Sequence, residues 1–248
     1  MLISSQNFII LEKVDSTNNY AMALIEKGEA TNETGIFALE QTSGKGRLGS
    51  KWESSVGKNI ILSTMVQMQW RQLYQQFQLS VATALACREF FLQFTGEDIK
   101  IKWPNDIYIN DRKAGGILIE NLVKGNLWQW AVIGIGLNIN ETSFADKDFK
   151  AISLQQITGI HYDSIELAKQ LHTGVLTKVG RLKNEAFPMM LDEYNDQLFC
   201  RSRKVRLRKE NVVFETVIEK VLPTGELITR DAIERRFVFD EVKWISFK

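Results

Sequence analysis

The sequence predicts an α+β fold, in which a mixed, largely antiparallel sheet carries helices on one face and is followed by a small β-barrel. Residues 71–96 of the 248-residue chain keep a helical apolar period long enough for a central core helix. Residues 98–140 have the composition of β-segments joined by tight turns. From about residue 200, short β-branched segments alternate, which is typical of a small barrel. We therefore expect one domain over residues 1–199 and a second over residues 200–248.

The first part of the chain predicts three strands and a helix around a glycine-containing loop. The strands are expected at residues 7–14, 35–41 and 59–67, and the helix at residues 15–28. Asp15 or Ser16 can cap this helix, and Gly28 ends it. The loop lies between the second and third of these strands, so two sheet elements hold its ends.

The rest of the chain predicts a group of strands, then helices, then the barrel. Strands are expected within residues 98–106, 107–125 and 126–140, with turns at Asn110-Asp111 and at Lys124-Gly125-Asn126. Residues 153–198 return to a helical period, and Pro188 suits a helix N-terminus. Pro223-Thr224-Gly225 marks a turn in the predicted barrel.

Composition predicts an ordinary globular protein of the cytoplasm. Hydrophobic residues make up 44% and charged residues 25% of the chain, and the net charge is +1. A charge this small calls for neither nucleic acid nor acidic lipid. The N-terminus lacks the features of a signal peptide, and no apolar run reaches the length of a membrane span, so we expect no membrane partner. Cys87 and Cys200 suit a reducing compartment, and we expect surface or structural roles for His161 and His172.

The loop "EQTSGKGRLGSKWES" (residues 40–54) contains Gly44, Gly46 and Gly49 in a G-x-G-x-x-G arrangement. A dinucleotide-binding loop requires a helix directly after it, but the residues that follow have no apolar helical period. A P-loop requires lysine before serine, whereas here Ser50 precedes Lys51. Two interpretations remain open: a loop whose backbone N–H groups and cations bind an anion, or a mobile surface loop.

Two further segments place cations and glycines where a strand alone would not need them. Lys100 and Lys102 lie on one face of an otherwise apolar strand, which leads into Trp103-Pro104-Asn105-Asp106. The last two of these residues are also typical of a simple turn. Lys113 precedes "AGGILIE", whose paired glycines weaken a strand unless something must approach its backbone.

These segments together resemble a known family. "DSTNNYA", "EQTSGKGRLGSKW", "KWPNDIY" and "KAGGILIE" follow one another in the order and approximate spacing found in biotin–protein ligases, also called biotin–[acetyl-CoA carboxylase] ligases. The resemblance is strong over roughly residues 8–140 and continues through "IGIGLNIN". It implies a class II synthetase-like catalytic domain that binds biotin and ATP over residues 1–199, followed by an SH3-like barrel. The implied reaction forms biotinyl-5′-adenylate and then transfers biotin to a lysine of a biotin carboxyl carrier protein domain.

The resemblance also implies roles for individual residues. Catalytic roles fall to Arg47, Lys113 and Asp106, of which Asp106 could take the proton from the incoming lysine. The implied biotin-binding residues are Ser16, Thr17, Asn18, Gln41, Lys45, Gly46, Arg47, Lys113, Gly116 and Leu118. The implied ATP- or adenylate-binding residues are Arg47, Trp52, Lys102, Asn105, Asp106 and Asn138. Helix capping remains the alternative for residues 16–18, and loop packing for Trp52. Mg²⁺ is expected as a cofactor held mainly by the ATP phosphates.

The sequence departs from the family pattern at one position, and several alternatives remain. The family loop is commonly G-R-G-R, whereas Lys45 here keeps the charge without the planar fork of arginine. The first expected strand begins near residue 7, so we expect no DNA-binding segment and no DNA partner; a homodimer is one expectation. Residues 201–209 are basic, but their alternation favours a half-solvated strand over an RNA site. A lipoate or octanoate ligase or transferase, and a non-catalytic biotin- or nucleotide-binding protein, remain the competing functions.

Overall fold

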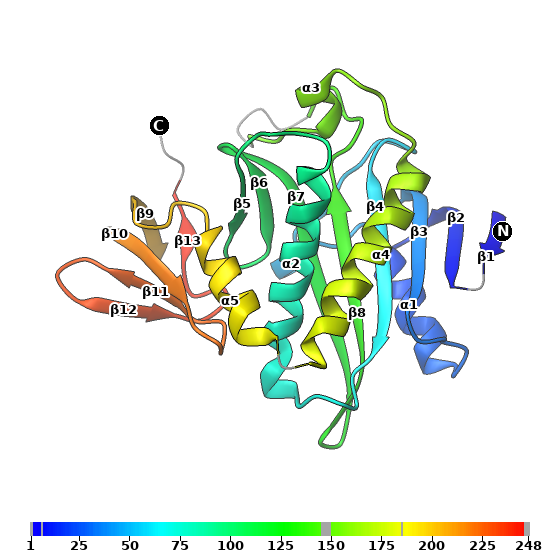
Figure 1. Cartoon of the computed structure of the whole chain (residues 1–248), viewed down its shortest axis with the longest axis horizontal. Coiled ribbons are helices and arrows are strands. Elements are labelled where there is room, and N and C mark those ends of the chain that lie inside the picture. Colours follow the sequence, from blue (N-terminus) through cyan, green and yellow to red (C-terminus); the bar gives the residue numbers. More distant parts are fainter. Residues whose placement is uncertain (1, 6, 145–149, 185, 246–248) are drawn as a thin grey trace.

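The centre of the computed structural model, which describes residues 2–5, 7–144, 150–184 and 186–245, is an eight-stranded mixed sheet (Figure 1). Its strands lie in the order β1-β2-β3-β4-β8-β7-β6-β5. Only β2 and β3 pair in parallel; every other neighbouring pair is antiparallel. The strands are β1 (Leu2–Ser5), β2 (Phe8–Val14), β3 (Thr34–Gln41), β4 (Ile60–Gln67), β5 (Ile99–Lys102), β6 (Asp106–Ile109), β7 (Arg112–Lys124) and β8 (Leu127–Leu137). The mixed, largely antiparallel sheet predicted from the sequence is thereby confirmed.

Three longer helices cover one face of this sheet. They are α2 (Gln76–Leu92), α4 (Ser164–Leu182) and α5 (Phe187–Asp196), seen in front of the strands in Figure 1. Helix α2 is buried on most sides because it packs between the sheet, α4 and α5. Shorter helical segments are η1 (Arg47–Gly49), η2 (Leu73–Gln75) and α3 (Leu154–Thr158).

Helix α1 (Thr17–Glu26) lies on the opposite face of the sheet, which corrects the expectation of helices on one face only. Its Ala21 and Ile25 pack in a separate hydrophobic cluster with Ile36, Met65 and Val132. Ile36 precedes Phe37, which belongs to the main core with α2 and α4. Successive residues of a strand point to opposite faces, so the two clusters lie on different sides of the sheet. The sequence pattern showed that α1 is amphipathic but not which face it covers.

A second, five-stranded antiparallel sheet follows, in the order β12-β11-β10-β9-β13. Its strands are β9 (Lys204–Lys209), β10 (Val212–Val221), β11 (Leu227–Arg230), β12 (Glu234–Phe237) and β13 (Lys243–Trp244). In β9, Val205 and Leu207 are buried while Arg206 and Arg208 are exposed. This pattern confirms that the basic stretch forms a half-solvated strand. In the described chain β12 and β13 do not pair with each other, so the predicted barrel is partly open.

The two sheets share one hydrophobic core, and tryptophans join them. Trp103, which is 1% exposed, donates its indole N–H to the carbonyl of Gly225 at 2.9 Å. Trp244 donates its own to the carbonyl of Trp103 at 3.2 Å. Gly225 lies in the predicted turn between β10 and β11, so this turn also carries the contact between the sheets. The division into domains at residues 199 and 200 stays a prediction.

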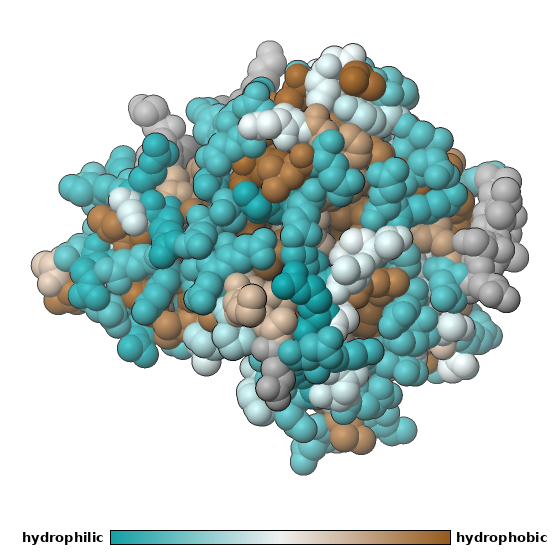
Figure 2. Space-filling model, viewed as in Figure 1, coloured by the Kyte–Doolittle hydropathy of each residue, from teal (hydrophilic) through white to brown (hydrophobic). Residues whose placement is uncertain are grey.

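The surface gives no sign of a broad apolar face on the side of α2, α4 and α5. Hydrophilic side chains cover most of this view, and hydrophobic residues occur in scattered groups (Figure 2). None of the described helices has the length and hydrophobicity needed to cross a membrane.

His172 on α4 provides a test of acid stability. Its Nδ1 lies 3.0 Å from the Thr64 hydroxyl, and its Nε2 lies 3.2 Å from the carbonyl oxygen of Glu33. Nε2 must therefore carry the proton of a neutral ring, because a carbonyl only accepts. Burial lowers the pKa of His172 below its ordinary value of about 6.5. Its structural role agrees with the sequence expectation.

We expect His172 to make the folded protein less stable as the pH falls below about 6.5. Below this pH, His172 binds a proton in the unfolded chain but not in the folded chain. The stability that the neutral ring contributes is therefore fully present above this pH and declines below it. His172→Gln should flatten the dependence of the unfolding free energy between about pH 7.5 and 5. Urea titrations at several pH values measure this, with the exposed His161→Gln as the control that should keep the parent slope. An unchanged slope in His172→Gln would contradict this explanation.

Candidate active site

A cavity of about 240 Å³ opens beneath the glycine loop, on the face of the sheet where α1 begins. The loop, the start of α1, the end of β3, the turn before β6, and strands β4, β7 and β8 contribute to its wall. Most of the residues singled out in the sequence line it: Ser16, Thr17, Asn18, Gln41, Lys45, Gly46, Arg47, Trp52, Asn105, Asp106, Lys113, Gly116 and Leu118. Segments more than a hundred residues apart in the sequence therefore meet at one place. Their binding roles stay predictions.

The start of α1 presents a fixed group of polar side chains to the cavity. Gln41 Oε1 accepts from the Thr17 backbone N–H at 2.7 Å and from its hydroxyl at 3.0 Å. Ser63 Oγ lies 2.7 Å from Thr17 Oγ1 and 2.6 Å from Asn18 Oδ1. Ser16 is the N-cap residue, but its side chain makes no capping hydrogen bond, so capping does not explain its hydroxyl. The arrangement offers hydrogen-bonding groups to a polar ligand at a helix N-terminus.

Asn18 is held from a second side, by a residue that the sequence did not point to. Its Nδ2 donates to Glu120 Oε2 at 2.7 Å and lies 3.4 Å from the carbonyl oxygen of Leu118. Glu120 Oε1 in turn lies 3.4 Å from Lys45 Nζ. Glu120 thus connects the start of α1 to the glycine loop. A single acidic residue in a strand gives no sequence signal for such a role.

Two glycines of β8 create the space for these side chains. A Cβ atom on Gly134 would lie 2.5 Å from Asn18 Oδ1, and one on Gly136 would lie 2.4 Å from the ring of Trp52. Both distances are too short for real contacts, so a larger residue would displace the cavity wall. The alternating glycines of "IGIGLNIN" are the sequence signal, because glycine weakens a strand unless another group must come close.

We predict that Gly134→Ala lowers the free energy of unfolding by about 1–3 kcal/mol. The added methyl group would contact Asn18. Hydrogen bonds to Glu120 and Ser63 hold the Asn18 side chain in place, so it cannot move aside freely. Chemical denaturation measures the change. The matched control is Gly174→Ala within α4, where a Cβ meets no atom within 4 Å and should stabilise the helix by about 0.5–1 kcal/mol. Equal stability of the two variants would contradict the close approach.

The charge on the cavity wall is mainly positive. Lys45, Arg47, Lys51 and Lys113 line it, and among its described lining residues Asp106 is the acidic one. Lys113 Nζ lies 2.6 Å from Asp106 Oδ1, and Arg47 Nη2 lies 2.9 Å from the carboxylate of Asp240 in the turn between β12 and β13. Counting Glu120 beside Lys45 as well, three carboxylates face the four cations, and the remaining excess of positive charge would favour an anionic ligand.

Lys102 and Asn138 do not line this cavity. Lys102 donates to the Tyr108 hydroxyl at 2.9 Å and lies within 5.1 Å of the ring centres of Tyr108 and Trp244. Burial lowers its pKa. Asn138 is buried and donates to the carbonyl groups of Lys113, at 3.3 Å, and Ile152, at 3.2 Å. It therefore supports the backbone of Lys113. Contacts of Lys102 and Asn138 with an adenylate stay predictions that this arrangement does not favour.

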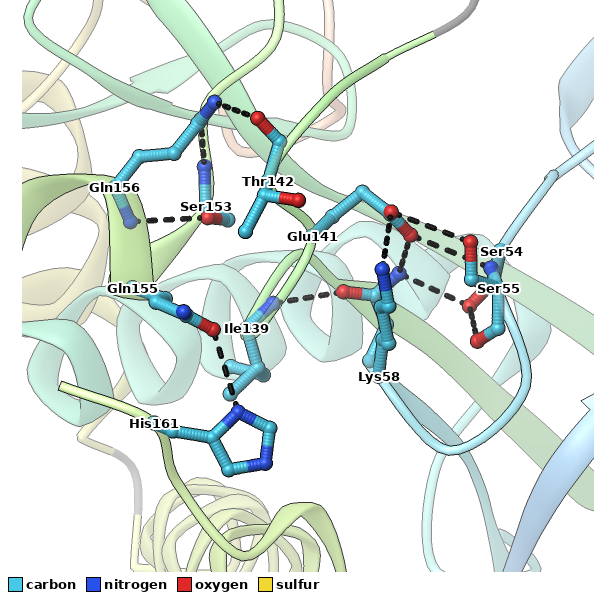
Figure 3. A network of polar contacts seen from close by, with 11 residues as sticks. Ser54, Ser55, Lys58, Ile139, Glu141, Thr142, Ser153, Gln155, Gln156 and His161 are labelled. Atoms are coloured by element: carbon cyan, nitrogen blue, oxygen red, sulfur yellow. Dashed lines mark hydrogen bonds and ion pairs between the residues drawn. The ribbon is translucent and has the colours of Figure 1, made fainter. Parts of the chain in front are cut away.

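A buried carboxylate fixes the segment that follows Trp52. Glu141, which is 7% exposed, accepts hydrogen bonds from the backbone N–H of Ser55 at 3.3 Å and from its hydroxyl at 3.2 Å. It also accepts from Asn59 at 3.3 Å and lies 3.4 Å from Lys58 Nζ. Figure 3 shows these contacts converging on Glu141. One end of the glycine loop is therefore anchored to the segment after β8. No local sequence pattern indicates this network.

The fold and the cavity together define an α+β protein with a cavity beneath a cationic loop, whose polar and charged lining would suit a polar, anionic small ligand. The chain belongs to the biotin/lipoate A/B protein ligase family, whose model matches residues 10–138. It is 35% identical over 170 residues to the bifunctional ligase/repressor BirA of Escherichia coli, covering 65% of this chain and 50% of that protein. It is 25% identical over 201 residues to the biotin–[acetyl-CoA-carboxylase] ligase of Mycobacterium tuberculosis, covering 80% of this chain and 73% of that protein.

A solved structure of similar fold extends over almost the whole chain. The Aquifex aeolicus biotin protein ligase, solved with biotin and ATP, superposes with a TM-score of 0.80 at 23% identity and covers 96% of this chain and 98% of that one. At this identity the likeness shows the fold. The chain spans about half the length of the bifunctional relatives it matches.

Proposed function

We propose that this protein is a biotin–protein ligase, which joins biotin to ATP as biotinyl-5′-adenylate and transfers the biotinyl group to a lysine of a biotin carboxyl carrier protein. The observation that carries the proposal is the single cavity in which the predicted biotin residues meet from separate segments. Membership of the biotin/lipoate A/B protein ligase family supports it. So do the relatives named as biotin–[acetyl-CoA-carboxylase] ligases and the similar fold solved with biotin and ATP.

Different regions of the cavity wall would suit successive parts of the biotin molecule. The polar group at the start of α1 offers donors and acceptors to the ureido ring. Apolar side chains on the α1 side of β4 and β7, Ile61 and Leu118, would accompany the aliphatic chain. Lys113 would then meet the carboxylate. A mostly apolar pocket with a few placed polar groups is typical of small-molecule sites.

The first step joins two anions, which explains the need for cations. A biotin carboxylate oxygen bonds to the α-phosphorus of ATP, and the bond from that phosphorus to the pyrophosphate leaving group breaks, with its electron pair leaving on pyrophosphate. Two unit charges 4 Å apart repel by about 4 kcal/mol at an effective dielectric of 20. Lys113, Lys45 and Arg47 on the cavity wall would offset this repulsion. Mg²⁺ would be held mainly by the ATP phosphates and would supply further neutralisation, with Asp106 as the nearby carboxylate.

In the second step the lysine amine of the carrier attacks the activated acyl carbon, and AMP leaves with the oxygen. The amine must lose a proton, and Asp106 is proposed to accept it. Asp106 lies 2.6 Å from Lys113, so the base and the cation that stabilises the acyl oxygen would be held together. The role of Trp52 against adenine, a homodimer and a cytoplasmic location remain further predictions.

Pyrophosphate release on mixing the protein with ATP and biotin tests the proposal. We expect release with biotin, formation of biotinyl-5′-adenylate by mass spectrometry, and labelling of one lysine of a carrier domain. Release with lipoate or octanoate instead would assign the chain to the other branch of the family. Binding of biotin without release of pyrophosphate would make it a binding protein. Either result would overturn the proposed function.

A further inference from the structure

The turn between β12 and β13 reaches the glycine loop through two adjacent residues, Phe239 and Asp240. Asp240 accepts a hydrogen bond from Arg47 Nη2 at 2.9 Å. The guanidinium carbon of Arg47 lies 5.0 Å from the centre of the Phe239 ring. Arg47 therefore carries a contact between the loop over the cavity and the C-terminal part of the chain, 193 residues away.

Phe239 is itself firmly seated. Its ring centre lies 5.9 Å from that of Phe77 on α2 and 5.6 Å from that of Trp103. Both neighbours are almost fully buried in the core that the two sheets share. The ring against which Arg47 packs is thus held in place. An arginine side chain that is already oriented loses less conformational entropy when it binds a ligand.

The contact leaves part of the guanidinium free for a ligand. In the described structure only Nη2 of Arg47 bonds to Asp240, and an arginine has further donors on Nη1 and Nε. Arg47 also lines both the main cavity and an adjoining one of about 140 Å³, whose wall includes Phe239. One arginine can therefore hold Asp240 and an anion in the cavity at the same time.

The backbone of Asp240 adopts a conformation in which a side chain introduces strain. Its φ is +69°, in the left-handed region that favours glycine. Asparagine and aspartate tolerate this conformation better than other residues with a side chain. Glycine would adopt this backbone conformation with less strain but would carry no carboxylate. The bond to Arg47 depends on that carboxylate.

We propose that Asp240, with Phe239, is a positioning residue that holds Arg47 in the wall of the cavity and thereby keeps the glycine loop over the activated intermediate. This inference rests on the proposed ligase function. It gives the C-terminal sheet a specific part in the reaction: retention of the acyl-adenylate until the acceptor lysine arrives. Asp240 acts only through Arg47 and does not touch the reacting atoms.

The test compares Asp240→Asn and Asp240→Gly in the full-length chain, without an acceptor protein. The ion pair is partly exposed, so we expect biotinyl-5′-adenylate to leave about two- to fivefold faster in both variants. Trypsin should also cut faster after Lys45, Arg47 or Lys51, a readout that does not depend on activity. Asp231→Asn is the matched control, because it removes an ion pair of 2.9 Å to Arg235 within the same sheet. It should leave both rates unchanged.

Two results separate positioning from a general effect on folding. Asp240→Gly relieves the left-handed backbone, so it should unfold at the same or a higher denaturant concentration than the parent while still losing adenylate faster. In an Arg47→Gly background, Asp240→Asn should add nothing, because the partner through which it acts is gone. The inference would be overturned if retention of the adenylate fell only in parallel with the stability of the fold. It would also be overturned if the effects of the two substitutions were additive in the double variant.

The outcomes also distinguish failure of this inference from failure of the proposed ligase function on which it rests. If the parent chain forms no biotinyl-5′-adenylate, the ligase function and this inference both fall. If the parent forms and retains the adenylate and Asp240→Asn retains it equally well, only the role of Asp240 falls.

Discussion

Lys113→Ala is expected to lower the rate of biotinyl-adenylate formation by about 100-fold or more while the protein remains folded. Lys113 is the cation on β7 that lies beside Asp106 in the cavity wall, where we propose the biotin carboxylate meets ATP. Its charge offsets the repulsion between two anions, and this repulsion is greatest as their oxygens approach in the transition state. A group that acts mainly in the transition state affects the rate more than it affects substrate binding.

The stability of the variant should change far less than its activity. Lys113 and Asp106 are partly exposed, with side-chain exposures of 18% and 22%, and such ion pairs contribute about 1 kcal/mol or less. Lys113→Met keeps the aliphatic stem and should be equally inactive, which separates charge from packing. Lys100→Ala is the control on β5: its Nζ contacts Asp98 and Gln197, away from the cavity, and its adenylation rate should match the parent. An unchanged adenylate yield in Lys113→Ala, measured by single-turnover pyrophosphate release, would exclude the proposed role.

The sequence predicted local elements well because their signals are local. The helical period of α2, the turn at Asn110 and the alternation in β9 each depend on neighbouring residues, and the structure agrees with them. The side of the sheet that α1 covers could not be predicted this way. It is decided by tertiary contacts with Ile36, Met65 and Val132, which lie on three different strands and are buried on the opposite face from Phe37.

The residues of the candidate site likewise divide into those that sequence patterns indicate and those that only long-range contacts reveal. Cations and glycines in unusual places led to Lys45, Arg47 and Lys113, and ordered motifs of a known family added the start of α1. Glu120, Glu141 and Asp240 gave no signal, because each acts through one long-range contact that composition and spacing cannot show. The contact of Lys102 with an adenylate stays a prediction. In the structure its side chain lies against Tyr108 and Trp244, which spacing alone cannot show.

Arg47→Gly is expected to release biotinyl-5′-adenylate about 10- to 100-fold faster than the parent and to label lysines without selection. The substitution removes the cation at the cavity wall, its bond to Asp240 and its contact with Phe239 at once. It also adds a fourth glycine to residues 44–49, beside Gly44, Gly46 and Gly49, which increases the freedom of the loop. The mixed anhydride that escapes would react with any exposed amine in solution. Accumulation of free adenylate and biotinylation of an unrelated lysine-rich protein measure the two effects.

The contribution of the lost cation can be separated from that of added flexibility. Leu48→Gly places glycine at the next position, where the backbone already has a φ of +53° and the side chain is 71% exposed. It loosens the loop but keeps Arg47, so release should stay within about twofold of the parent if the cation retains the intermediate. Arg47→Lys keeps the charge but loses the fork that can hold Asp240 and an anion together, and should fall between the two. Release from Leu48→Gly as fast as from Arg47→Gly would show that flexibility alone governs retention, and the role given to the arginine would then be wrong.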